Sequence, residues 1–327
     1  MSAKTFLIAL AAAVAVPCAA LSQDYPVVGK PVRLVVPFPA GAEVFDATAR
    51  MVAKKLSESL GVPVIVDNRP GGGNIVGNQA VASAAPDGHT LLYGLIPSLT
   101  MLPHQLARRP YDEFRDFTPI TAVARSPLFL MAHPSVPAKN LGQLVAYARA
   151  NPGKLAFASW QFGGLNQVYL EMLKAEAGID MIHIPYKGPD DALRDLLEGR
   201  IQLMLGGSQT HVDLVRAGKL NALAATGGAR MRSMPDLPTF AEQGFSGYEH
   251  VGGVGIFGPG GMAPATVGRL NAELSRVLRM PEVVDFFVQL APTIEVEPST
   301  PGELGAQVRA QYDAMGPIIR KLGIRID

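Results

Sequence analysis

The strongest constraint in this sequence is the alternation of short β-branched runs with stretches of helical periodicity. Residues 32–36 (Val-Arg-Leu-Val-Val) are typical of a strand, and Pro37 and Pro39 end it. Over residues 46–60 the apolar side chains recur at helical spacing, and Gly61 is typical of a helix end. Strands that alternate with helices in this way predict an α/β fold, with parallel strand pairing and helices on both faces of the sheet.

The same rhythm returns in a second part of the chain. A length of 327 residues favours about two domains, so we expect two α/β units. Further strands are expected at residues 62–66, 90–94, 128–132, 155–158, 181–184, 201–205 and 220–225. Further helices are expected at residues 74–85, 166–177, 190–198, 266–278 and 282–290, with two more after the caps Asn140 and Thr300.

The position of a binding site follows from this order of elements. Open parallel sheets bind ligands beyond the carboxyl ends of their strands. We therefore expect functional residues in the loops that follow strands, at residues 38–45, 95–101, 159–165 and 206–210.

The N-terminus has the composition of a secretory signal peptide. Lys4 precedes an uncharged apolar run at residues 6–16, too short to span a bilayer, and small residues follow at positions 19, 20 and 22. We expect residues 1–22 to be removed by cleavage near Ser22; cleavage after Ala20 and a short core helix are the alternatives. Removal takes away Cys18, the only cysteine, so the expected mature protein is exported, soluble and without disulfides.

Charge and motif content exclude several classes of function. The 29 Lys and Arg residues balance 28 Asp and Glu residues, which excludes the basic surface that nucleic-acid binding requires. Residues 206–210 (GGSQT) lack the final glycine of a nucleophile elbow. Residues 253–258 match G-x-G-x-x-G, but Pro259-Gly260-Gly261 follows where a dinucleotide site needs a helix. The six histidines lack the spacing of a metal site, so we predict no catalytic group, metal or cofactor.

A series of short motifs resembles the substrate-binding proteins of tripartite tricarboxylate transporters, the Bug family of periplasmic receptors. The motifs follow the family's order and spacing, so the resemblance covers the whole expected mature chain. They are residues 30–41 (KPVRLVVPFPAG), 67–74 (DNRPGGGN), 85–88 (APDG), 110–112 (PYD), 116–120 (DFTPI), 151–155 (NPGKL), 184–188 (IPYKG), 217–220 (AGKL) and 237–244 (LPTFAEQG).

The resemblance implies a type II periplasmic binding fold, with two lobes, two crossing segments and a ligand cleft between the lobes. Crossings are expected near residues 122–125 and 249–252. Lobe one is then residues 23–123 and 251–327, and lobe two is residues 124–250.

The resemblance also implies a receptor and not an enzyme. The receptor would capture a small organic carboxylate in the periplasm and deliver it to the membrane permease subunits of a tripartite transporter. A monomer can perform this task, so we expect a monomer. The alternatives are a ligand-sensing receptor for a signalling system and, less favoured, an α/β hydrolase.

The ligands implied are small monocarboxylates or dicarboxylates, held largely by backbone amides of the loops named above. Gly41 would let the backbone approach a ligand, and the helix expected from Asp46 would turn N–H groups and its positive dipole end toward an anion. Hydroxyl groups of Ser98, Thr100 and Ser159 are candidate donors, with turn or capping roles as the alternative. The full set of candidate residues is Phe38, Ala40, Gly41, Ala42, Phe45, Asp46, Ser98, Thr100, Ser159, Trp160, Phe162, Gly163, Gly164, Asp195 and Gly206, with Asp195 matching a family residue that orients the ligand.

Departures from the family pattern predict an unusual ligand. The first loop is one residue longer and carries Glu43, whose carboxylate would repel a dianion. Trp160 and Phe162 stand where small polar residues are common, and Gly206 stands where relatives often carry Asp. We therefore hypothesise a roomier, more apolar cleft that favours an aromatic or amphipathic monocarboxylate over citrate-like acids. The alternative is that the two aromatic residues pack between the lobes.

Overall fold

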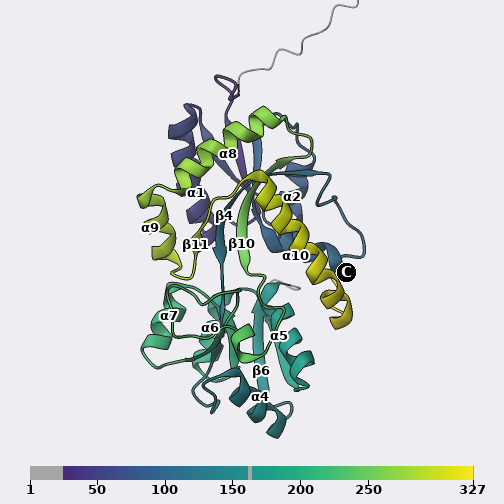
Figure 1. Cartoon of the computed structure of the whole chain (residues 1–327), viewed down its shortest axis with the longest axis vertical. Helices are drawn as coiled ribbons and strands as arrows, with labels where there is room; N and C mark the ends of the chain where they lie inside the picture. The colour runs from purple at the N-terminus through teal and green to yellow at the C-terminus, as the bar shows by residue number, and fades with distance from the viewer. Residues whose placement is uncertain (1–24, 161–163, 327) are drawn as a thin grey trace, which may run out of the picture.

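The structure is a computed structural model that describes residues 25–160 and 164–326. The expected signal peptide, residues 1–22, lies outside the described residues, as do the candidate site residues Phe162 and Gly163. Two sheets form the centres of two lobes, drawn above and below in Figure 1. One sheet has six strands in the order β11-β4-β10-β3-β1-β2, and the other has five in the order β7-β6-β8-β5-β9.

The six-stranded sheet joins strands from two distant parts of the chain. Its strands are β1 (Val32–Val36), β2 (Val64–Asn68), β3 (Thr90–Leu95), β4 (Phe117–Ser126), β10 (Gly252–Pro259) and β11 (Glu295–Val296). Around it lie helices α1 (Glu43–Leu60), α2 (Ile75–Ala82), α3 (Ile96–Thr100), α8 (Pro264–Leu278), α9 (Pro281–Leu290) and α10 (Pro301–Leu322) (Figure 1).

Both faces of this sheet are buried, which explains the unbroken apolar run of β1. Because successive side chains of a strand point to opposite faces, Leu34 packs in one core with Leu56 of α1 and Leu270 of α8. Val35 points the other way and packs with Val81 of α2 and Leu304 of α10. A strand covered by helices on both faces reads as a continuous apolar segment.

The five-stranded sheet lies entirely in the middle of the chain. Its strands are β5 (Phe129–Ala132), β6 (Leu155–Trp160), β7 (Met181–Tyr186), β8 (Leu203–Gly206) and β9 (Asn221–Ala225). Its helices are α4 (Leu141–Ala150), α5 (Leu165–Ala177), α6 (Pro189–Leu197) and α7 (Gln209–Arg216). As predicted, the Asn140 side chain caps α4, accepting a hydrogen bond from the Gln143 N–H at 2.9 Å.

The expectation of parallel pairing is correct for only part of each sheet. Strand β1 pairs in parallel with β2 and β3, and β6 pairs in parallel with β7 and β8. Strand β10 is antiparallel to both β3 and β4, and β5 is antiparallel to both β8 and β9. Strands β10 and β5, which form these antiparallel pairs, stand next to the two passages of the chain between the lobes.

The chain passes between the lobes along two adjacent strands. Strand β4 ends at Ser126, and β5 of the other sheet begins three residues later at Phe129. Strand β10 returns beside β4, with Gly252 opposite Ser126. The glycines of residues 253–258 therefore lie inside a strand and not in a phosphate-binding loop. A Cβ on Gly253 would come within 2.8 Å of the Ala124 carbonyl oxygen, which explains the absence of a side chain there.

The C-terminal helix contacts both lobes. The first half of α10 packs Leu304 and Val308 into the core of the six-stranded sheet. Its second half places Met315 and Ile319 in the same apolar cluster as Tyr169 of α5. Figure 1 shows α10 running down from the upper lobe toward α5.

Other differences from the expected elements are local. Residues 95–101, expected as a loop, contain the short helix α3, and α7 was not expected. Helix α1 begins at Glu43, three residues before the expected start. No helix within residues 25–160 and 164–326 combines the length and hydropathy needed to cross a membrane.

Candidate functional site

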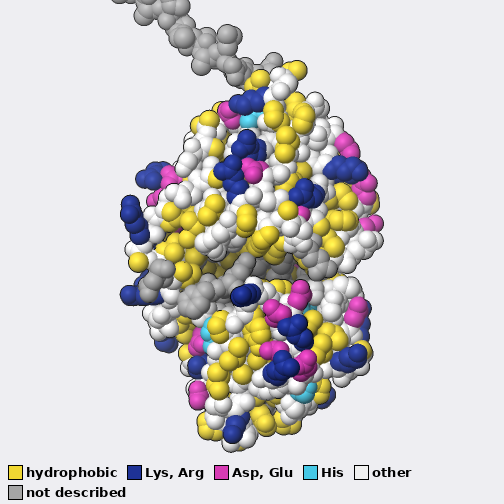
Figure 2. Space-filling view, turned by 180° about the vertical axis from the view of Figure 1, so that it is seen from behind, with side chains coloured by type: hydrophobic (Ala, Val, Ile, Leu, Met, Phe, Trp, Pro, Cys, Tyr) yellow, Lys and Arg dark blue, Asp and Glu magenta, His cyan; other side chains and the backbone are white. Residues whose placement is uncertain are grey.

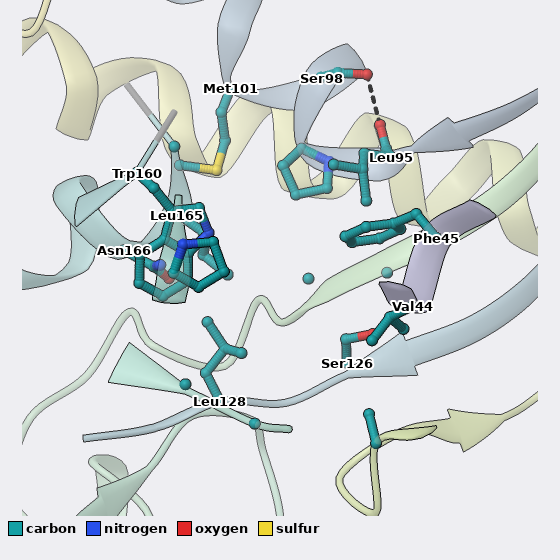
Figure 3. Close-up of a pocket in the computed structure, with 18 of the residues that line it drawn as sticks. Val44, Phe45, Leu95, Ser98, Met101, Ser126, Leu128, Trp160, Leu165 and Asn166 are labelled. Atoms are coloured by element: carbon teal, nitrogen blue, oxygen red, sulfur yellow. Dashed lines mark hydrogen bonds between the residues drawn. The ribbon is translucent and has the colours of Figure 1, made fainter. Parts of the chain in front are cut away.

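A cavity of about 280 Å³ lies between the two lobes. Its walls come from both sheets' loops and from the crossing strands, including Ser126 of β4 and Gly252 of β10. Figure 2 shows the molecule narrowing between the lobes, with hydrophobic side chains along the edge of the upper lobe and charged side chains on the facing edge of the lower lobe. Figure 3 shows the residues that line the cavity.

The ends of several strands and the starts of several helices converge on this cavity. In the described chain, β1, β2, β3, β6, β7 and β8 are each followed by a helix whose first residues line it. These lining residues are Val44 and Phe45 of α1, Asn74 before α2, Pro97 of α3, Leu165 of α5, Pro189 of α6 and Ser208 before α7. The first N–H groups of a helix lack intrahelical partners, and the helix dipole is positive there.

The described residues that line the cavity include no Lys, Arg, Asp or Glu. Apolar residues are the largest group among them: Val44, Phe45, Leu95, Pro97, Met101, Leu102, Leu128, Trp160, Leu165, Pro189, Ala291 and Ile294. A partial positive charge from helix N-termini, set in an apolar wall, suits one anionic group attached to an apolar body.

Among the first-loop candidates, only Phe45 lines the cavity. Its ring stacks on that of Phe38, with centroids 4.4 Å apart. The cavity is not lined by the other first-loop candidates, which are Phe38, Ala40, Gly41, Ala42 and Asp46. Phe45 points toward the cavity from the start of α1 (Figure 3).

Asp46 organises the first loop. Its carboxylate accepts hydrogen bonds from the Gly41 N–H at 2.9 Å, from Asn68 Nδ2 at 2.8 Å and from Arg50 Nε at 2.9 Å. Burial opposes ionisation, but the hydrogen bonds from Arg50, Gly41 and Asn68 outweigh it and lower the pKa of Asp46 to about 2. The Gly41 amide, expected to bind the ligand, therefore already has an internal acceptor.

The three candidate hydroxyl groups also have partners within the chain. Ser98 lines the cavity, but its Oγ donates to the Leu95 carbonyl oxygen at 2.7 Å (Figure 3). Thr100 is fully buried and donates to the Ile96 carbonyl oxygen. Ser159 is buried behind the cavity wall, with its Oγ 2.6 Å from His183 Nε2. Each of the three hydroxyl groups therefore has a hydrogen-bond partner within the chain, and the contacts of Ser98 and Thr100 with preceding carbonyl groups are of the turn type that was the alternative.

In lobe two, Trp160, Gly164 and Gly206 line the cavity, whereas Asp195 does not. The Asp195 carboxylate accepts hydrogen bonds from the Tyr186 hydroxyl at 2.8 Å and from Arg200 Nη1 at 2.9 Å. Asp195 therefore connects α6 to β7 and to the start of the next strand. The side chain of Trp160 lies against the cavity beside Leu165 (Figure 3).

Sequence reasoning missed several polar residues of the cavity. Asn74, Asn166 and His211 all line it, and each is less than a tenth exposed. His211 belongs to a capping box at the start of α7, in which its backbone N–H donates to the Ser208 side chain. The spacing Ser-x-x-His was the available signal, but capping boxes are usually recognised by Glu or Gln at the last position.

The fold and the cavity define a class: a two-lobed α/β receptor that binds a small solute between its lobes. The chain matches the sequence profile described as "Tripartite tricarboxylate transporter family receptor" over residues 48–324, and it belongs to this family. The predicted family and two-lobed fold are confirmed. The protein is a solute-binding receptor of a periplasmic family and not an enzyme.

Individual relatives agree with this assignment. The UPF0065 protein in the tcbD-tcbE intergenic region of Pseudomonas sp. (strain P51) is 38% identical over 265 residues, which cover 80% of this chain and 77% of the relative. The solved structure of periplasmic binding protein BugD is 31% identical with a TM-score of 0.75, covering 90% of this chain and 98% of BugD. The structure of an R. palustris protein with adipate is 30% identical with a TM-score of 0.78, covering 92% of this chain and 99% of that one.

Proposed function

We propose that the protein captures a small aromatic or amphipathic monocarboxylate in the interlobe cavity and delivers it to the membrane permease subunits of a tripartite transporter. It acts in the periplasm as a monomer, after cleavage of the signal peptide near Ser22. Lobe one comprises residues 23–123 and 251–327, and lobe two comprises residues 124–250. In support of these limits, the six-stranded sheet takes its strands from residues 32–126 and 252–296, and the other sheet from residues 129–225.

One observation carries the proposal: helix N-termini from both lobes converge on a cavity whose described lining has no charged side chain. A hydrogen bond to a charged oxygen contributes about 1.5–3 kcal/mol. A few such bonds, after the cost of ordering the ligand, suffice for micromolar affinity, which corresponds to about 8 kcal/mol. A carboxylate can therefore be held without a counter-ion from Lys or Arg.

The apolar lining favours a ligand with a single charged end. A second carboxylate placed against Val44, Leu128 or Leu165 would lose its hydration without gaining a partner, which is costly. The ring of Phe45, which is stacked on that of Phe38, presents a flat apolar surface suited to an aromatic or extended aliphatic body. The solved structure of the R. palustris relative contains adipate, an acid with an apolar chain that carries two carboxylates.

A ligand that contacts both lobes shifts the population of the receptor toward its closed form. The closed form is what a permease would recognise. A signalling protein would recognise the same form, so a sensing receptor is the second candidate. A sensing receptor would use the same cavity as a transport receptor, and would differ only in binding a signalling protein and not a permease.

Thermal denaturation with a panel of acids tests the ligand class. Benzoate- and nicotinate-type acids are expected to raise the melting temperature by a few degrees at 100-fold excess over Kd, where binding adds about 2.7 kcal/mol. Phthalate, malate and citrate should act more weakly, and uncharged benzamide should have no effect. If citrate alone raises the melting temperature, the aromatic monocarboxylate is the wrong ligand class.

Uptake measurements test delivery. A strain that lacks this chain should lose high-affinity uptake of the labelled acid that binds in vitro, and uptake should return when the full chain is restored. Unchanged uptake together with a lost transcriptional response to the acid would favour the sensing receptor instead.

A further inference from the structure

His211 is a buried polar side chain of the cavity wall with one engaged and one unengaged ring nitrogen. It is 5% exposed and lines the cavity from the first turn of α7. Its Nδ1 atom lies 3.1 Å from the Ser208 backbone nitrogen and 2.9 Å from Ser208 Oγ. Its Nε2 atom has no hydrogen-bond partner among the described residues.

The Ser208 contact assigns the tautomer of this imidazole. A backbone N–H can only donate, so Nδ1 must accept and the ring proton must be on Nε2. Burial lowers the pKa of His211 to about 4, with the Asp190 carboxylate acting in the opposite direction, so the ring is neutral at pH 7. Nε2–H is therefore a fixed, uncharged donor in the wall of the cavity.

Gly206 is the residue that makes room for this ring. A Cβ at position 206 would come within 2.6 Å of Nδ1 and 2.7 Å of Cε1 of His211. It would also approach Met131 Cε at 2.8 Å, but the end of a methionine can move more easily. The glycine at the end of β8 and the histidine of α7 thus form a matched pair.

A second donor lies in the same lobe. Asn166, in the first turn of α5, is 6% exposed, lines the cavity, and has no side-chain hydrogen bond within the described residues. Figure 3 shows it beside Trp160 and Leu165, across the cavity from Val44 and Phe45 of lobe one. Lobe two therefore places two buried polar side chains, His211 and Asn166, in the cavity wall together with the ring of Trp160, and lobe one places the ring of Phe45 there.

We propose that Nε2–H of His211, together with the Asn166 amide, donates hydrogen bonds to the ligand carboxylate, so that the acid group is bound by lobe two and the apolar body faces Phe45. This orientation rests on the proposed function, because it requires a carboxylate in the cavity. The opposite orientation would place the carboxylate near buried polar side chains of lobe one such as Asn74.

Two substitutions distinguish the role of Nδ1 of His211 from that of Nε2. In His211→Asn, Oδ1 can still accept from the Ser208 N–H, but the donor at the Nε2 position is lost. In His211→Gln, the side-chain amide reaches the Nε2 position, but the acceptor for Ser208 is displaced. Calorimetric titration with benzoate or nicotinate should show affinity about 10- to 100-fold weaker for His211→Asn and close to wild type for His211→Gln. Melting temperatures should show the reverse order, with His211→Gln the less stable.

His133→Asn is the matched control: it makes the same substitution in lobe two, at a histidine that does not line the cavity, and it should change the affinity little. If His211→Asn binds as the wild type does, or loses no more affinity than His133→Asn, the proposed orientation is wrong. A wild-type protein that binds no organic acid would instead disprove the proposed function.

Two further measurements do not depend on the stability of the His211 variants. The Nε2–H proton resonance of His211 in the wild type should shift downfield when the acid is added, because it gains a charged acceptor; an unchanged resonance in the saturated complex would overturn the proposal. Gly206→Ala should also weaken binding by displacing the ring, and a Gly206→Ala variant with wild-type affinity would argue against the matched pair.

Discussion

Asp46 shows how a single buried carboxylate can shape the cavity without contacting the ligand. It accepts hydrogen bonds from the loop backbone at Gly41, from β2 at Asn68 and from its own helix at Arg50. Gly41 has a φ of 83°, in the left-handed region that glycine tolerates, so the chain can turn back toward Asp46. The start of α1, and with it Phe45, is fixed by this set of contacts.

Asp46→Asn is therefore expected to destabilise the protein at neutral pH. The folded-state pKa of about 2 lies below the usual value of 3.8, so ionised Asp46 contributes about 2 kcal/mol of stability above pH 4. This contribution is lost as the pH falls from about 4 to about 2. Urea denaturation at pH 7 and pH 3 should show a difference between wild type and variant that shrinks at the lower pH.

The exposed Asp285 of α9 offers a matched control, because Asp285→Asn removes the same charge from the surface. It should change the urea midpoint little at either pH. Equal midpoints for Asp46→Asn and wild type at pH 7 would contradict the role assigned to Asp46.

At the residue scale, the sequence predicted which loops line the interlobe cavity better than which side chains do. Residues of all four loops that were expected to be functional line it, because the chain order of strands and helices determines where those loops lie. The donor roles of Ser98 and Ser159 depended on which partner each hydroxyl meets in three dimensions, and both meet partners within the chain. His211 was missed because its importance arises from the adjacent Gly206, through a contact that helical or strand periodicity does not reveal.

At the scale of elements, strong local signals gave the most accurate boundaries. The capping box predicted at Thr300 is present: Thr300 Oγ1 accepts from the Glu303 N–H at 3.2 Å, and Glu303 Oε2 accepts from the Thr300 N–H at 2.8 Å. Strand β4 was missed over most of its length because Pro119 interrupts it. Helix α7 was missed because its first turn is polar and follows two glycines.

Thr300→Ala should destabilise the protein by about 1 kcal/mol. The Glu303 N–H loses its acceptor, and the Glu303 carboxylate, which accepts from the Thr300 N–H, loses the hydroxyl group that positions it. Thr300→Ser keeps the hydroxyl and serves as the control. Urea denaturation compares the two variants, and an equal loss in both would mean that the threonine methyl group, and not the cap, contributes the stability.

At the scale of the whole molecule, the features that connect the lobes include the paired strands β4 and β10, the helix α10, and a side-chain contact across the cavity. In the contact, Thr293 Oγ1, which follows α9 in lobe one, donates to the Gly207 carbonyl oxygen of lobe two at 2.8 Å. Thr293 is 3% exposed, and a Cβ on Gly207 would come within 2.5 Å of its Oγ1. The hydrogen bond between Thr293 and Gly207 could not be predicted from the sequence. The two residues are 86 positions apart, and only the tertiary structure brings them together.

Thr293→Val tests whether this hydrogen bond holds the lobes together, because valine keeps the shape and removes the donor. A neutral hydrogen bond contributes about 0.5–1.5 kcal/mol, so the closed population of the ligand-free protein should fall by about 2- to 10-fold. Small-angle X-ray scattering without ligand should show a larger radius of gyration, and affinity for the bound acid should weaken by a similar factor because closure then costs more. Thr118→Val removes a comparable hydrogen bond, from Thr118 Oγ1 to the Pro259 carbonyl oxygen at 2.7 Å, that lies wholly within lobe one. This control should lower stability without changing the radius of gyration. If the two variants scatter alike, the Thr293 contact does not govern closure, and α10 and the paired strands set the angle between the lobes by themselves.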